Sequence, residues 1–109
     1  MSSRPTLAEI NDRFRCSFIG GEVYLTRGIA DLPALAQADI IAQVRRFDSF
    51  TEDNDPYGEH DFGSLDHSLA GKVFWKIDYY DPDKERGSED PLDPAKTCRA
   101  LTILLAEEW

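Results

Sequence analysis

The chain has 109 residues, of which 41% are hydrophobic and 11% aromatic, and it carries a formal net charge of −9 at pH 7. A chain of this length builds one compact core, and its apolar content excludes an intrinsically disordered protein, so we expect a single folded domain over residues 1–109. The N-terminal segment is polar, and no stretch approaches the roughly 18 apolar residues of a membrane span, which predicts a cytoplasmic protein without a membrane partner.

The negative charge is concentrated in the middle of the chain. Between Asp48 and Pro94 there are 14 acidic and four basic residues, whereas the remaining residues are nearly neutral in sum. Affinity for DNA and RNA comes largely from lysine and arginine side chains that neutralise phosphates, so this balance argues against direct nucleic-acid binding. It favours a basic partner or a cation; the alternative is an acidic surface that only keeps the protein soluble.

The first predicted element is a helix over residues 6–18. Thr6 and Glu9 form a capping-box pattern at its start. Apolar residues recur at helical spacing and define the face expected to be buried: Leu7, Ile10, Phe14 and Phe18. The charged residues expected to point away from that face are Glu9, Asp12, Arg13 and Arg15.

A strand over residues 22–26 and a second helix are predicted next. The sequence EVYLT alternates apolar and polar residues, as a half-buried strand does. The helix is expected from about Asp31 to about Phe47, because its apolar residues form one stripe and because Arg45 and Arg46 favour the C-terminal end of a helix.

Two further strands are predicted over residues 61–67 and 72–80. Residues 81–94 hold three prolines among many acids, which indicates an exposed loop. The last segment, TCRALTILLAEEW, follows a helix-start pattern but alternates like a strand, and a strand is the interpretation we favour. Together the elements predict an α+β fold in which two helices pack on one face of a short antiparallel sheet of about four strands.

The segment NDPYGEHDFG, residues 54–63, concentrates carboxylates around one imidazole. With the residue before it, this segment offers a candidate metal set of Asp53, Asp55, Glu59, His60 and Asp61. An EF-hand loop starting at Asp53 would lack its bidentate glutamate, because Ser64 stands at the twelfth position. The other interpretation is structural: Asp55 caps a turn, His60 lies inward with a hydrogen-bonded ring, and Asp61 points the opposite way.

The sequence contains no nucleophile elbow, P-loop or glycine-rich dinucleotide loop, and its only histidines are His60 and His67. We therefore expect no enzymatic activity and no cofactor. The function we expect is binding, with carboxylates that occupy the basic groove of a nucleic-acid-binding protein. The acids expected to contact this partner are Asp53, Asp55, Glu59, Asp78, Asp81, Asp83, Glu85, Glu89, Asp90 and Asp93. A metal-binding protein or metal-dependent enzyme built on residues 53–61 is the alternative.

Several strings of unusual composition are similar to one family. They are NDRFR, LTRGI, FDSFTEDNDPYGEHDFG, FWKIDYYD, GSEDPLDP and RALTILLAEEW. Over nearly the whole chain they resemble the small bacterial proteins grouped as domain of unknown function 3768. The resemblance implies cargo of plasmids and other mobile elements, where small acidic proteins often inhibit host defence, as anti-restriction and anti-CRISPR proteins do. It implies no catalytic residues.

Overall fold

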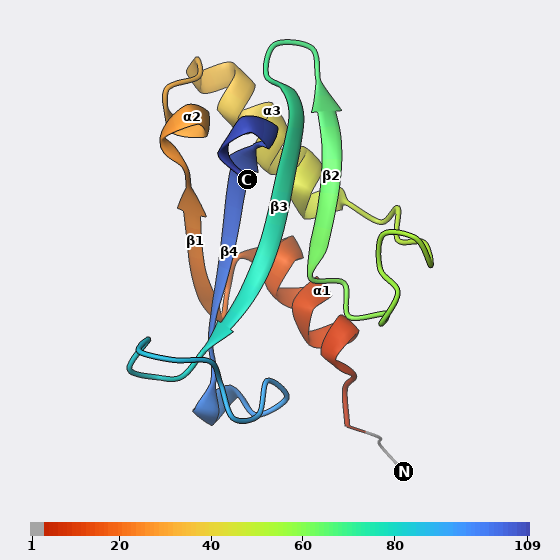
Figure 1. Cartoon of the computed structure of the whole chain (residues 1–109), viewed down its shortest axis with the longest axis vertical. Coiled ribbons are helices and arrows are strands. Elements are labelled where there is room, and N and C mark those ends of the chain that lie inside the picture. The colour runs from red at the N-terminus through yellow and green to blue at the C-terminus, as the bar shows by residue number, and fades with distance from the viewer. Residues whose placement is uncertain (1–3) are drawn as a thin grey trace.

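The computed structural model describes residues 4–109, which contain a four-stranded sheet with the strand order β1-β4-β3-β2 (Figure 1). The strands are β1 (Gly21–Leu25), β2 (Phe62–His67), β3 (Gly71–Tyr80) and β4 (Cys98–Leu105). The helices are α1 (Leu7–Ser17), α2 (Arg27–Ala30) and α3 (Ala34–Arg46), and two short 3-10 turns, η1 (Pro94–Lys96) and η2 (Ala106–Glu108), flank β4. The predicted α+β class is confirmed, and α1 and α3 lie together on one face of the sheet, behind it in Figure 1.

Helix α1 begins as its capping pattern predicts. The Thr6 hydroxyl accepts a hydrogen bond from the Glu9 N–H, and the Glu9 carboxylate accepts one from the Thr6 N–H, both at 3.1 Å. The expectation that Arg15 points away from the buried face is wrong, because Arg15 is only 3% exposed. Its guanidinium lies over the rings of Phe50 and Trp75, at 5.3 and 5.1 Å from their centroids, and these aromatic faces replace water around the charge.

The second predicted helix corresponds to α3, which begins at Ala34 and ends at Arg46. A further single turn, α2, precedes it in a region where no helix was expected, so the described chain has three α-helices and not two. Ile29 in this turn is fully buried, and the Ala30 N–H donates to the Thr26 carbonyl at 2.8 Å. Burial of one apolar side chain stabilises a turn that is too short to show a helical pattern.

The sheet is mixed, which corrects the expectation of a wholly antiparallel one. Strand β4 pairs antiparallel with β3 and β3 with β2, but β4 pairs parallel with β1, so that Val23 lies opposite Leu101. Alternation along a strand defines its two faces but not its neighbour, and the long connection from β1 to β4 can return the chain in either direction. The last segment is a strand, as we favoured.

The core lies between the sheet and the two larger helices. Trp75, at its centre, is fully buried and packs edge-on against Phe47, with 5.4 Å between ring centroids. Strand β3 contributes Val73, Trp75 and Ile77 to the core, as its alternation predicts. Among residues 4–109, no helix of comparable length lies on the opposite face of the sheet, and η2 lies in front of that face in Figure 1. Within residues 4–109, no helix has the length and apolar content needed to cross a bilayer.

Candidate functional site

The loop between α3 and β2, residues 47–61, is folded around Asp55. Its carboxylate accepts hydrogen bonds from the backbone N–H groups of Glu59, at 3.0 Å, and His60, at 3.3 Å. His60 adopts a left-handed backbone conformation with φ of 55°, which turns the chain toward α1. Asp55 therefore caps this turn, as the structural interpretation expects.

His60 anchors the loop to α1. Its Nδ1 lies 3.0 Å from both carboxylate oxygens of Asp12, and its ring stacks on Phe50 with centroids 3.8 Å apart and planes inclined by 3°. Asp12 is also ion-paired with Arg15 at 2.9 Å. The imidazole is thus held on its edge by a carboxylate and on its face by an aromatic ring.

A second set of hydrogen bonds centres on Asn11, which is fully buried. Its amide Nδ2 donates to the Glu59 carbonyl at 2.9 Å and to the Tyr79 hydroxyl at 2.8 Å, and its Oδ1 accepts from Arg99 Nε at 3.0 Å. The Tyr79 hydroxyl in turn donates to Asp61 at 3.2 Å. Asn11 therefore connects α1, the 47–61 loop, β3 and β4. We refer to Asn11, Asp12, Arg15, His60, Tyr79 and Arg99 as the anchoring cluster.

The carboxylates of Glu59 and Asp61 lie close together at the edge of this cluster. Burial raises the pKa of Glu59, and the neighbouring carboxylates of Asp61 and Asp55 raise it further. Burial likewise raises the pKa of the Tyr79 hydroxyl. In the folded state the pKa values of both groups therefore lie above their ordinary values. The hydrogen bonds of the cluster join residues of the chain to one another, so the cluster holds the loop on α1.

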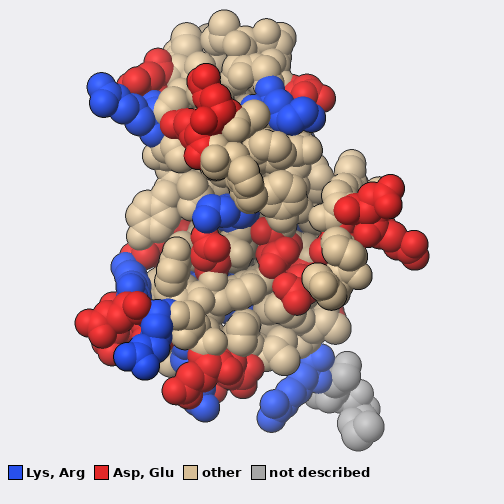
Figure 2. Space-filling model, viewed as in Figure 1, with Lys and Arg blue, Asp and Glu red and all other residues tan. Residues whose placement is uncertain are grey.

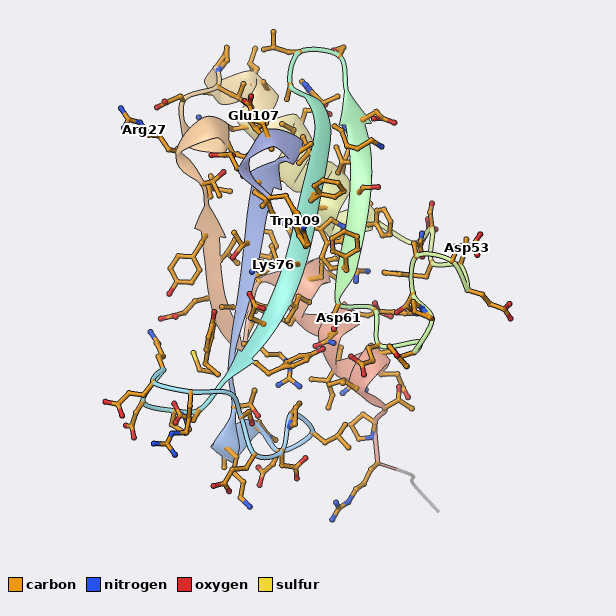
Figure 3. The ribbon with its side chains drawn as sticks, viewed as in Figure 1. Arg27, Asp53, Asp61, Lys76, Glu107 and Trp109 are labelled. Carbon is orange, nitrogen blue, oxygen red and sulfur yellow. The ribbon has the colours of Figure 1, made fainter. Side chains whose placement is uncertain are left out.

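The structure places the candidate metal ligands in two groups. Asp55, Glu59, His60 and Asp61 meet at the anchoring cluster, with His60 Nε2 at 3.6 Å from Asp55, whereas Asp53 is exposed at the outer side of the loop (Figure 3). In residues 4–109, no three His, Cys, Asp or Glu side chains are arranged to hold a metal ion.

The ten acids expected to contact a partner do not form one continuous surface. Four of them are exposed: Asp53, Asp83, Glu85 and Glu89. Four accept hydrogen bonds from nearby backbone N–H groups: Asp55, Asp81, Asp90 and Asp93. In Figure 1 the 47–61 loop lies to the right of β2, whereas the loop that follows β3 lies at the lower end of the sheet, so their exposed acids are separated. Glu59 lies beside the anchoring cluster, where its carbonyl accepts from Asn11, and Asp78 lies on β3, paired with Lys76.

The sheet face opposite α1 and α3, which we call the open face, carries an aromatic group over β2 and β3. Trp109 packs against Phe62 of β2 and Phe74 of β3, with ring centroids 5.3 and 5.4 Å apart, and it remains 68% exposed (Figure 3). Tyr24 of β1 and Tyr80 of β3 are also exposed, at 47% and 38%. Exposed aromatic side chains on a rigid element are typical of binding surfaces.

The lysines of the open face are paired within the chain. Lys76 is 2.9 Å from Asp78, Lys72 is 3.5 Å from Asp66, and Lys84 is paired with Glu22. The hydrogen bonds from Lys84 and from Tyr24 lower the pKa of the Glu22 carboxyl. Figure 2 shows acidic side chains at several positions around this face, with uncharged side chains between them. In the loop after β3, Asp83 and Glu85 make no ion pair within the described residues, and neither does Arg86.

The sequence analysis missed both the anchoring cluster and the aromatic group. Asn11 follows Leu7 by four residues, which places it on the same, buried face of the helix. Because asparagine is polar, we did not expect it to be buried. Phe62 and Phe74 fall on the open face by simple alternation along their strands. No comparable signal identifies Trp109, because its position depends on a turn after β4.

Comparison with known proteins gives one match. The family model described as Protein of unknown function (DUF3768) matches residues 25–108. No curated protein and no solved structure matches the chain.

Proposed function

The chain belongs to the DUF3768 family of proteins of unknown function, and from this premise we propose that it is a non-catalytic binding protein whose open face takes a basic protein surface. The observation that carries the proposal is the exposed Trp109, supported by Phe62 of β2 and Phe74 of β3 on the sheet face opposite α1 and α3. Binding energy in protein interfaces concentrates in such aromatic anchors, which sit inside a more polar rim.

The charge around the open face favours a basic partner. Its lysines are neutralised by neighbouring acids, whereas Glu107 beside Trp109 and Asp83 and Glu85 in the loop after β3 are exposed acids without an ion pair among the described residues. Carboxylates placed in this way attract arginine and lysine side chains and accelerate encounter at low salt. They repel nucleic acid, so the partner we propose is a protein.

The partner class we propose is a bacterial defence complex with a nucleic-acid groove, of the CRISPR effector or restriction type. Such a groove is lined with arginine and lysine that bind phosphates, and the carboxylates of this chain would stand in for those phosphates. The support is the complementarity of charge together with the resemblance to mobile-element cargo.

A competition experiment tests the proposal. Immobilised protein is exposed to purified CRISPR effector and restriction complexes, and bound complex is then challenged with the cognate nucleic acid. We expect the nucleic acid to compete, and binding to weaken as salt rises from about 50 to about 300 mM, because the attraction is screened. Simultaneous binding of protein and nucleic acid without interference would refute the groove as target.

Two sets of variants locate the surface. Trp109→Ala is expected to weaken binding by at least about tenfold, which corresponds to about 1.4 kcal/mol. Leu35→Ala is the control, because Leu35 is 86% exposed but lies on α3, on the other side of the sheet. Asp83→Lys with Glu85→Lys should lower the association rate and leave the melting temperature unchanged. Equal losses for Trp109→Ala and Leu35→Ala would show that the open face is not the binding surface.

Thermal melting with EDTA, together with elemental analysis, distinguishes the metal-binding alternative from the binding protein proposed here. A metal held by Asp55, Glu59, His60 or Asp61 would stabilise the folded state, so EDTA would lower the melting temperature and elemental analysis would detect the ion. For the binding protein proposed here, we expect EDTA to leave the melting temperature unchanged.

A further inference from the structure

A cavity of about 300 Å³ lies on the side of α1, away from the open face, between this helix and the segment that precedes β4. Its apolar walls come from Ile10 and Phe14 of α1, Ile19, and Leu92. Ile19 and Leu92 are 79% and 48% exposed, so the rim of the cavity is apolar as well. A concave site of this size with apolar walls has the dimensions of a small ligand-binding pocket.

Arg99 provides a cation in this cavity. It is only 3% exposed, and its guanidinium donates to two neutral oxygens, the Asn11 side-chain oxygen at 3.0 Å and the Pro91 carbonyl, and lies over the Tyr79 ring, 5.5 Å from its centroid. Within residues 4–109 no carboxylate oxygen lies within 4.0 Å of it, although the chain has 21 acidic residues. Buried charges in proteins are generally paired, so an arginine without an anion, lining a cavity, indicates a place for one.

Arg13 adds a second cation at the rim. It is exposed and makes no ion pair within the described part of the chain. Asp90 and Asp93 line a neighbouring cavity that shares Leu92 and Pro94 with this one, and their carboxylates accept from the Leu92 and Ala95 backbone N–H groups at 3.1 and 2.9 Å. In a protein with a net charge of −9, this cavity therefore has two arginines and no carboxylate in its lining.

We propose that this cavity binds a small amphipathic carboxylate, with its carboxylate on Arg99 and Arg13 and an apolar body the size of an aromatic ring against Ile10, Phe14 and Leu92. Arginine binds carboxylates through paired, charge-assisted hydrogen bonds, which a neutral amide does not replace. The apolar walls select against acetate and other small anions, because these bury no apolar surface. The site is independent of the proposed partner surface, since it lies on the other side of the sheet.

The test uses 3-phenylpropionate as probe, with 3-phenylpropionamide and acetate as matched controls, and follows ¹⁵N-labelled full-length protein by NMR. We expect 3-phenylpropionate to shift backbone signals of residues 10–20 and 91–99, and the amide and acetate to bind at least about tenfold more weakly. Equal affinity for acid and amide, shifts elsewhere in the chain, or no shift at about 10 mM probe would overturn the proposal.

Variants are chosen to keep the fold intact. Arg99 also donates a hydrogen bond to Asn11, so its replacement would disturb the fold. The test therefore uses Arg13→Gln and Leu92→Ser. Arg13→Gln should weaken binding of the acid severalfold and leave the weak binding of the amide unchanged, whereas Leu92→Ser should weaken both. Arg27→Gln is the control with the same change of charge, since the Arg27 side chain is 93% exposed on α2 and does not line the cavity. An equal effect of Arg13→Gln and Arg27→Gln on binding of the acid would contradict the assignment.

Discussion

At the scale of single residues, the 47–61 loop is held by a few polar contacts among buried and half-buried groups. Asp12 binds the His60 ring, Asn11 binds the Glu59 carbonyl, and Asp55 closes the turn between them. Each of these contacts joins the loop to α1 or to itself. The loop is thus ordered by its own Asp55 and His60 together with Asn11 and Asp12 of α1, and Asp55 and His60 are two of the polar residues that make NDPYGEHDFG unusual.

His60→Ala is expected to lower the free energy of unfolding by about 1–3 kcal/mol, because the variant leaves Asp12 without one partner and removes the ring stacked on Phe50. Urea denaturation measures the change. His60→Asn is a second variant that tolerates the left-handed backbone at this position, so that a similar loss in both variants assigns the effect to the side chain. If His60→Ala unfolds like the parent but loses partner binding, the loop is itself a binding site.

Glu59→Gln is expected to raise the melting temperature at pH 7. The folded-state pKa of Glu59 lies above its ordinary value of 4.5, so the ionised carboxylate opposes folding at neutral pH, and this penalty disappears as the pH falls through the raised pKa. The difference from the parent should therefore shrink toward pH 4. Glu89→Gln, in an exposed loop, changes the net charge equally and controls for it. A stabilisation by both variants would attribute the effect to net charge.

At the scale of elements, the packing of β2 on β3 depends on the absence of one side chain. A Cβ atom at Gly63 would lie 2.5 Å from Trp75 Nε1 and 2.8 Å from Phe47 Cζ. Trp75 is fully buried and has no space to move away. Gly63 therefore allows the central tryptophan to lie flat against the neighbouring strand.

Gly63→Ala should destabilise the protein by about 1–3 kcal/mol, since the added methyl group overpacks the core. Chemical denaturation checks this value. Gly87→Ala is the matched control, because a Cβ at Gly87 has its nearest neighbour at 3.8 Å and the backbone there is not left-handed. Equal stability of the two variants would show that β2 and β3 can separate at little cost.

At the scale of the whole molecule, the end of the described chain is tied to its first third through one carboxylate. Glu108 accepts hydrogen bonds from the Thr26 hydroxyl at 2.6 Å, the Gly28 N–H at 3.0 Å and the Leu105 N–H at 2.9 Å. These contacts hold η2 against α2 and so place Trp109 over Phe62 and Phe74. The partner surface that we propose is therefore assembled from the sheet and from the turn that follows it.

Glu108→Gln is expected to lower the melting temperature at pH 7 and to approach the parent in acid. The hydrogen bonds from Thr26, Leu105 and Gly28 lower the pKa of Glu108, so its contribution to stability is complete above the ordinary value of 4.5 and is lost as the pH falls through the folded-state pKa. Glu107→Gln, the neighbouring exposed acid, is the control. Thermal melting of both variants between pH 3 and pH 7 measures the effect; parallel curves would exclude a specific role for Glu108.

The sequence alone determined most local elements, although no pattern in it indicated the short helix α2. The capping box at Thr6 and Glu9, the period-two alternation of β3 and the strand character of residues 98–105 all follow from residues a few positions apart, and backbone geometry allows few alternatives at that range. It also indicated a protein of the DUF3768 family, because the strings that carry the resemblance are long and unusual in composition.

Only the tertiary structure decided which of these elements meet. The parallel pairing of β1 with β4, the burial of Arg15 and the separation of the two acidic loops appear in no local pattern. The bond from Arg99 to Asn11 spans 88 residues and that from His60 to Asp12 spans 48. From sequence alone a polar residue is predicted to be exposed, because the partner that would allow its burial is not known. Contacts at such separations are determined by the packing of the whole core, which no short stretch of sequence contains.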